Sequence, residues 1–150
     1  MHAARAATAG DLPSIAALLE SARAELCTAR GGDLLLAREM ASLDPAGLLD
    51  DPAAFVVVGT FDEVVVGIAT ARLETLSDGS RLAVIGSLYV DREAREVGVG
   101  EAMLDQIFPW AKEHGCRGID ALVLPGMRES KNFFEMFGLV ARAIVVHRPL

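Results

Sequence analysis

The sequence predicts a single α/β domain built around a mixed sheet, and three observations support this. Three segments rich in β-branched residues follow one another in the middle of the chain and are joined by short turns, which predicts antiparallel neighbours. The last third alternates helical and strand-like segments, which predicts parallel pairing and helices on the sheet faces. The length of 150 residues suits one domain, which we expect to span 1–150.

The first third is predicted to be mainly helical. A short strand is expected over Ala4–Ala7. Asp11 then stands at the N-cap position of a helix, with Pro13 in its first turn. Apolar residues recur at helical spacing and predict one buried face, made of Ile15, Leu18, Leu19, Ala22 and Leu26. A second helix is predicted over Leu34–Leu43.

The later elements follow from the same patterns. Strands are predicted over Ala54–Thr60, Val64–Leu73 and Arg81–Val90. A helix is expected from about Val99 to Gly115, followed by an apolar strand over Gly118–Leu124. A short helix, Glu129–Phe137, ends at Gly138, and a final strand is expected over Leu139–His147.

Composition excludes several classes of protein. The net charge of -7 and the pI of about 4.9 disfavour binding to nucleic acid or to an anionic membrane. No segment approaches the roughly 18 apolar residues of a membrane span, and the start of the chain lacks a leader pattern, so we expect a soluble, cytoplasmic protein. Cys27 and Cys116 are not at metal-ligand spacing, and no metal is expected.

The segment Leu88–Leu104 carries the strongest chemical pattern. A strand ends, and a polar turn containing Arg95, Gly98 and Gly100 opens a long helix. Glycines at a helix start let backbone N–H groups approach a phosphate, and the helix dipole favours its negative charge. A dinucleotide-binding loop would need Gly or Ala where Met103 stands, and the Gly-Lys-Ser/Thr ending of a nucleotide P-loop is missing. A pyrophosphate cradle is therefore predicted, and a purely structural strand-to-helix turn is the alternative.

The chain resembles the GNAT superfamily of N-acetyltransferases. The motif Arg95-x-x-Gly98-x-Gly100 after Leu88-Tyr89-Val90 is similar to the cofactor-binding motif of that family. The segment Arg5–Ile15 resembles its first strand and helix, and Phe133–Leu139 resembles its closing helix. The resemblance covers almost the whole chain in the right order and is weakest over Cys27–Asp51.

The resemblance implies that acetyl-CoA is the cosubstrate. Its pantetheine arm would pair with backbone groups of a strand end, namely Leu88, Tyr89 and Val90. Its pyrophosphate would lie against the loop and helix start, namely Arg95, Glu96, Val97, Gly98, Val99, Gly100 and Glu101. The cofactor would lie where the strand ending at Val90 splays from the strand Gly118–Leu124. Further cofactor contacts are expected from the last helix, namely Ser130, Lys131 and Phe134, and the resemblance also allows for a homodimer.

The catalytic groups depart from the family pattern. Phe134 stands where the family often has a tyrosine that protonates the leaving thiolate, and Met127 stands where it often has an asparagine. Neither Gly86 nor Ser87 is acidic, although many members have an acidic base near these positions. The candidate bases are therefore Glu74, directly or through water, and Asp120 on the strand flanking the expected gap. The backbone N–H near Val90 would hold the oxyanion.

We interpret the chain as an acetyl-CoA-dependent N-acetyltransferase that acts on a primary amine by direct transfer within a ternary complex. The amine could belong to a small molecule, a peptide or a protein. Its site is expected to be formed by Cys27–Met40, including Arg30 and Asp33, and by the turn Leu76–Ser80. The alternative is a CoA-binding regulatory module without efficient turnover. An interaction domain without a small ligand is disfavoured by the intact Arg95–Gly100 loop.

Overall fold

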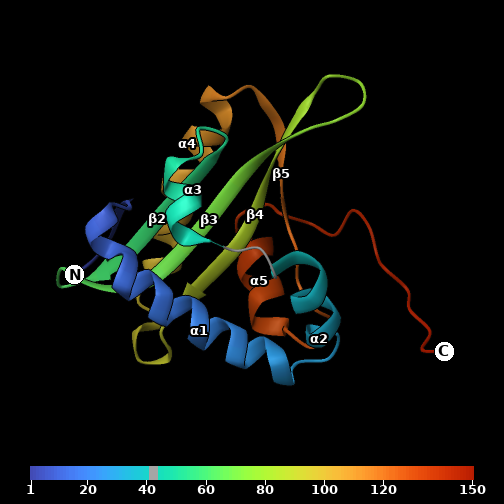
Figure 1. The fold of residues 1–150 in the computed structure, drawn as a ribbon, viewed down its shortest axis with the longest axis horizontal. Helices are drawn as coiled ribbons and strands as arrows, with labels where there is room; N and C mark the ends of the chain where they lie inside the picture. The colour runs from blue at the N-terminus through green and yellow to red at the C-terminus, as the bar shows by residue number, and fades with distance from the viewer. Residues whose placement is uncertain (41–43) are drawn as a thin grey trace.

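The centre of the molecule is one mixed sheet (Figure 1). The computed structural model describes residues 1–40 and 44–150. The five strands, in their order across the sheet, are β1 (His2–Ala6), β2 (Ala54–Phe61), β3 (Val64–Thr75), β4 (Arg81–Val90) and β5 (Cys116–Ala121). Neighbours from β1 to β4 are antiparallel, and β4 and β5 are parallel. The predicted mixed sheet is confirmed, and so is the hairpin of β2 and β3.

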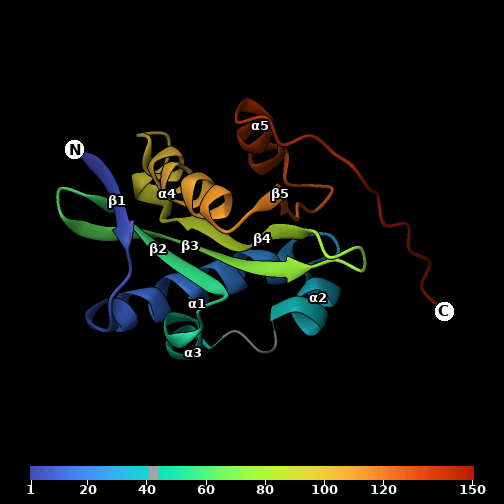
Figure 2. The same ribbon diagram turned by 90° about the horizontal axis from the view of Figure 1, so that it is seen from above.

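Helices cover both faces of the sheet. They are α1 (Leu12–Thr28), α2 (Gly32–Leu35), α3 (Pro45–Asp50), α4 (Val99–Glu113) and α5 (Arg128–Met136). Figure 2 shows α4 and α5 on one face and α1, α2 and α3 on the other. The second helix predicted over Leu34–Leu43 is only partly found, since α2 continues as a π-helical segment, Leu36–Met40. The end of that prediction, 41–43, lies outside the described residues.

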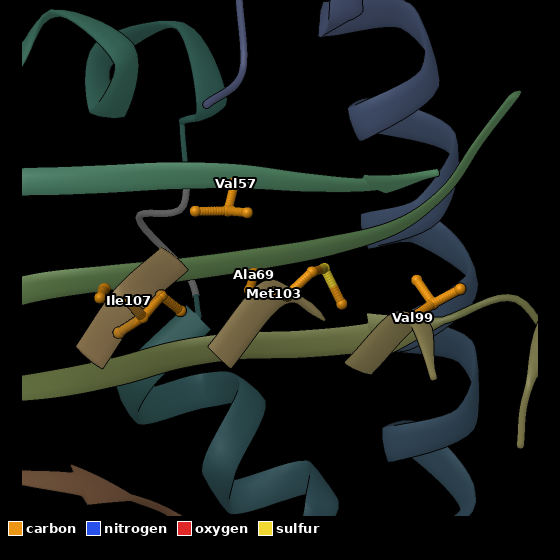
Figure 3. Close-up of a cluster of buried hydrophobic side chains, with 6 residues drawn as sticks. Val57, Ala69, Val99, Met103 and Ile107 are labelled. Atoms are coloured by element: carbon orange, nitrogen blue, oxygen red, sulfur yellow. The ribbon is translucent and has the colours of Figure 1, made fainter. Parts of the chain in front are cut away.

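Two glycines bring α4 close to the sheet. Val99, Met103 and Ile107 of α4 lie against Val57 and Ala69 in a fully buried cluster (Figure 3). Gly59 of β2 pairs with Gly67 of β3 beneath the first turns of this helix, and a Cβ at Gly59 would lie 2.4 Å from Val99 Cγ1. A side chain at this point would push the helix away from the sheet. The glycine pair therefore holds the first turn of α4 against the sheet.

On the opposite face, α1 packs its predicted apolar stripe. Ile15 and Leu18 lie against Val56, Val58 and Ile68 of the sheet. This face accounts for the helical spacing of apolar residues in the first third of the sequence.

The side chain of Asp11 does not cap α1, so that part of the prediction is wrong. It accepts hydrogen bonds from both terminal nitrogens of Arg5, at 2.7 and 2.9 Å, and from the Thr8 N–H at 2.8 Å. The Asp11 carboxylate joins β1 to the start of α1 instead.

The predicted final strand, Leu139–His147, is also wrong. The last backbone hydrogen bond of the described chain runs from the Leu139 N–H to the Phe134 carbonyl at 3.0 Å. Beyond it the segment is extended without strand pairing and runs away from the domain (Figure 1). The composition of this segment is strand-like, but a strand needs a partner edge, and this one has none within the described chain. As a result, β5 is an edge strand of the sheet, as β1 is on the other side.

Candidate active site

The strands β4 and β5 separate halfway along β4. Their parallel pairing ends at Ile85 and Ala121, whereas β4 continues to Val90 beside β3 alone. The register with β3 shifts where Thr70 pairs with Ser87 and Ala71 with Ile85, which leaves Gly86 as the extra residue of a bulge. A bulge bends its strand and is common next to functional sites. The splay expected between these two strands thus begins at Gly86.

Backbone groups of β4 face this opening. The Asp91 N–H donates to the Val66 carbonyl of β3 at 2.8 Å. In an antiparallel pair the hydrogen-bonding direction alternates along a strand, so Tyr89 also bonds to β3, and Leu88 and Val90 direct their N–H and C=O groups to the open edge. The 2.8 Å hydrogen bond from Arg95 Nε to the Val90 carbonyl fits this direction. The edge can therefore accept an extended, amide-bearing molecule as an added strand.

The side chain of Tyr89 points to the other face of the sheet from those of its neighbours. Tyr89 packs with the α1 cluster, whereas Leu88 and Val90 pack with the α4 cluster. This arrangement confirms the orientation that strand alternation predicts for Tyr89.

The loop between β4 and α4 ends in an uncapped helix start. Glu96 and Gly98 both have positive φ angles, of 66° and 94°. No side chain caps α4, and its first backbone bond runs from the Ala102 N–H to the Gly98 carbonyl at 3.0 Å. Within the described residues, the N–H groups of Val99, Gly100 and Glu101 consequently have no partner. Unpaired N–H groups at a helix start form an anion-binding site.

Arg95 is bound to an acidic residue of α1. Its Nη2 donates to both carboxylate oxygens of Glu25 at 3.1 Å, and Arg92 Nε donates to Glu25 Oε1 at 2.7 Å. The Arg95 guanidinium also lies 5.3 Å from the centre of the Tyr89 ring. Burial disfavours the charge of Glu25, but the hydrogen bonds from the two arginines outweigh it and lower the pKa of the carboxyl. A phosphate arriving at the loop has to compete with Glu25 for Arg95.

Glu25 was not among the candidates from sequence. One pattern could have revealed it, because Glu25 continues the α1 stripe of Ile15, Leu18 and Ala22 at helical spacing. A carboxylate on an otherwise apolar helix face needs a hydrogen-bond or ion-pair partner when that face is buried against the sheet. That partner is the cofactor loop.

The predicted α5 contacts fall in different environments. Phe133 covers Gly100, where an added Cβ would lie 3.0 Å from its ring. Phe134 is buried with Ile85 and Leu104, below the opening. Lys131 is exposed and pairs with Glu135 at 3.4 Å, and Ser130 is half-buried. Thus α5 lies beside the start of α4, but its predicted contact residues differ in burial and in their partners.

The two candidate bases do not meet at the opening. Glu74 is exposed and pairs across the sheet with Leu82, eight residues and therefore roughly 26 Å along β4 from Val90. Asp120 pairs with Val84, just before the splay, and its carboxylate is bound by Arg142. Hydrogen bonds from Arg142, opposed by burial, lower the pKa of Asp120. A carboxylate held in this way is a weak proton acceptor.

Two other features lie at the opening. The Ser87 hydroxyl, next to the Gly86 bulge, is buried without a hydrogen-bond partner in the described chain. The loop before α2 also reaches this side, since a Cβ at Gly31 would lie 3.7 Å from Leu124 Cδ2, three residues beyond β5. The turn Leu76–Ser80 precedes the opposite end of β4. The structure therefore separates the two segments expected to form the acceptor site.

The fold and the open strand edge define an acyltransferase-like α/β protein, and the family model agrees. The model of the acetyltransferase (GNAT) family matches residues 16–139. The chain belongs to the GNAT family of acetyltransferases, enzymes that use acetyl-CoA. Comparison with curated proteins gave no significant match.

Solved structures share the fold over most or all of the chain. AAC(6')-Iy, in complex with the bisubstrate analogue CoA-S-monomethyl-acetylneamine, has a TM-score of 0.76 at 19% identity, covering 100% of this chain and 98% of that one. A transcriptional regulator from Bacillus halodurans C-125 has a TM-score of 0.72 at 20% identity, covering 100% of both chains. An acetyltransferase from Vibrio fischeri has a TM-score of 0.63 at 26% identity, covering 79% of this chain and 93% of that one. None of the described helices is long and apolar enough to cross a membrane.

Proposed function

We propose that the chain transfers the acetyl group of acetyl-CoA directly to a primary amine. The observation that carries the proposal is the free edge of β4, from Gly86 to Val90, beside the uncapped start of α4. Amide groups of the pantetheine arm would pair with Leu88 and Val90. The pyrophosphate would lie against the loop from Arg95 to Glu101.

The residues present fit this cosubstrate. The N–H groups of Val99, Gly100 and Glu101 have no partner among the described residues and suit a phosphate at the start of α4. Arg95 would add a charged contact after leaving Glu25. Contacts from Ser130, Lys131 and Phe134 of the last helix stay secondary proposals. The residue of this helix that lies against Gly100 is Phe133.

The proposed mechanism is attack by a neutral amine within a ternary complex. The Val90 N–H would donate to the carbonyl oxygen of the acetyl group as negative charge develops there. Neither thiol supports a covalent route, because Cys27 is exposed on α1 and Cys116 pairs with Arg81, nine residues before Val90. Of the two candidate bases, Asp120 lies just before the splay and would act through water, whereas Glu74 lies too far from Val90 for one water to bridge. The buried Ser87 hydroxyl suits such a water as a partner.

The acceptor is proposed to be an amine of a small molecule, a peptide or a protein, bound beside the loop that carries Arg30 and Asp33. The net charge of -7 favours a cationic acceptor over nucleic acid or an anionic membrane. The AAC(6')-Iy complex, whose analogue joins CoA to an acetylneamine, agrees with a small amine. The expected cytoplasmic location stays a prediction.

Thiol release from acetyl-CoA, measured against a panel of amines, tests the proposal. At least one amine should raise the release above the rate of hydrolysis, and mass spectrometry should find that amine acetylated. Tight CoA binding with no transfer to any amine would instead support the CoA-binding regulatory module. The similar Bacillus halodurans structure is that of a transcriptional regulator. A protein that does not bind CoA at all would overturn both the acetyltransferase and the regulatory-module proposals.

A further inference from the structure

A pocket lies where β3 begins and β4 ends, between the β2–β3 hairpin and the loop that leads into α4 (Figure 1). Its volume is about 390 Å³. Phe61, Val64 and Val66 of the hairpin and Val97 of the loop form its apolar lining. Three of these four side chains are 37–62% exposed, so large apolar groups are left open to solvent here. The size and the lining of this hairpin pocket are those of a small-molecule site.

The hairpin pocket is separate from the open edge of β4. The order of the strands places β3 on one side of β4 and β5 on the other. The open edge lies on the side where β5 splays away, whereas the pocket lies on the β3 side, against Val64 and Val66. Asp91, Glu93 and Val97 of the loop form the opposite wall. The pocket therefore adjoins the loop but is not on the path proposed for the pantetheine arm.

The polar side chains that line the hairpin pocket are all acidic. They are Asp62, Asp91 and Glu93, and no lysine or arginine of the described residues lines it. The α-ammonium of Met1 binds Asp62, while Asp91 and Glu93 have no basic partner in the part of the chain that the structure describes. Two carboxylates are thus available beside the apolar lining.

The basic residues of the same loop are held away from the pocket. Arg92 and Arg95 both bind Glu25 of α1, and neither lines the pocket. A cation that enters the pocket therefore displaces no arginine and meets a negative potential. An aromatic ring beside carboxylates also suits an ammonium group, because the ring face attracts a cation. Phe61 supplies that ring.

We propose that the hairpin pocket binds a small organic cation, an ammonium group on an apolar body, as a second ligand beside acetyl-CoA. The ammonium would lie at Asp91 and Glu93 with a cation–π contact from Phe61, and the apolar body would cover Val64 and Val97. The pyrophosphate of acetyl-CoA is anionic, so a cation on the other side of the loop should favour its binding, and each ligand should favour the other by the same factor. Only this coupling rests on the proposed function.

Binding of benzyltrimethylammonium to the full chain, without CoA, tests the pocket. A quaternary ammonium cannot be acetylated, so the measurement is free of the transfer reaction. NMR titration should shift the amides of Val64, Val66 and Val97. The anion 3-phenylpropanoate, which carries a similar ring and the opposite charge, should leave them unchanged. No shift of these amides at millimolar cation, or equal shifts with the anion, would overturn the proposal.

Two double variants test the role of the carboxylates. Asp91→Asn/Glu93→Gln keeps the shape of both side chains and removes their charge, so the cation should bind at least about tenfold more weakly. Asp105→Asn/Glu113→Gln removes the same charge from two exposed positions of α4 and is the matched control. It should change the affinity by less than about twofold. Equal weakening in both variants would mean that the cation responds only to net charge, and the assigned site would be wrong.

Calorimetric titration of acetyl-CoA with the pocket saturated by the cation, at constant ionic strength, tests the coupling. The affinity for acetyl-CoA should rise by about twofold or more. An unchanged affinity would overturn the coupling, and a lower one would mean that the two ligands compete for one site. A chain that binds the cation at the hairpin pocket but not acetyl-CoA would overturn the proposed function and support the pocket.

Discussion

At the scale of single residues, Tyr89 is the one tyrosine of the sequence, and its position argues against a role as the acid. Its side chain lies on the α1 face with the hydroxyl 3.5 Å from Glu25 Oε1, while the open edge is formed by Leu88 and Val90. Burial, and next the charge of Glu25, raises the pKa of Tyr89. A thiol with a pKa near 8.5 is a fair leaving group without help.

The variant Tyr89→Phe should therefore keep kcat within about tenfold of wild type, since a positioned acid is typically worth 10²–10⁴-fold. Steady-state acetyl transfer measures this, with calorimetry to check acetyl-CoA binding. A hundredfold drop in kcat with unchanged binding would identify Tyr89 as the acid.

Glu25 should restrain the cofactor loop. Replacing it by glutamine removes the negative charge that holds Arg92 and Arg95, so the affinity for acetyl-CoA should rise by about threefold to tenfold, or roughly 0.7–1.4 kcal/mol. Calorimetric titration measures the change. Glu20→Gln, an exposed change on the same helix, is the control and should have little effect. Weaker binding in Glu25→Gln would mean that Glu25 preorganises Arg95 instead of competing for it.

These residues show what sequence could and could not reveal about the site. The side-chain direction of Tyr89 follows from strand alternation, which is a local rule and held here. The partners of Glu25 are about 70 residues away in the chain, so no local pattern names them. The orphaned Ser87 hydroxyl likewise depends on what the folded sheet places around it.

At the scale of elements, the start of α4 should depend on Gly98. Its φ of 94° is strained for a β-branched residue, and a Cβ there would lie 2.9 Å from the His2 ring. Gly98→Val should weaken acetyl-CoA binding by more than about tenfold, or 1.4 kcal/mol. Gly115→Val is the matched control, because Gly115 has a φ of 71° at the other end of α4 and open space around it. Equal affinity in both folded variants would contradict the placement of the pyrophosphate.

The elements also show where pattern reading succeeds. The strand Arg81–Val90 is predicted with its observed bounds. A short turn joins it to the strand before it, and after it helical and strand-like segments alternate clearly along the sequence. The strand predicted over Leu139–His147 does not form, although its composition is as apolar as that of Arg81–Val90. Strand propensity describes a segment, whereas a strand forms only where that segment pairs with a neighbouring strand. No edge of the described domain is paired with this segment.

At the scale of the whole molecule, stability should depend on pH through Asp11. The carboxyl is 8% exposed, and hydrogen bonds from Arg5, opposed by burial, hold its pKa well below the usual range. A lowered folded-state pKa stabilises the fold above the unfolded pKa, near 3.9, and this contribution is lost as the pH falls further.

Asp11→Asn should accordingly lower the free energy of unfolding by about 2 kcal/mol at pH 7. The difference from wild type should narrow as the pH falls from about 5 toward 2. Urea unfolding of both proteins across this range measures it. A difference that does not change with pH would mean that Asp11 acts through packing and not through its charge.

The uncapped start of α4 has a consequence for isotope exchange in solution. The amides of Val99, Gly100 and Glu101 lack partners within the part of the chain that the structure describes. Ala102 begins the bonded ladder of a helix held against the sheet by Gly59 and Gly67. Deuterium should enter the first three amides quickly and the following ones slowly, with a sharp boundary at Ala102. A phosphate bound at the helix start would bond the fast amides and slow them. The exchange rates of these three adjacent amides therefore report whether the loop holds its ligand. They can be measured by mass spectrometry or NMR without any substitution.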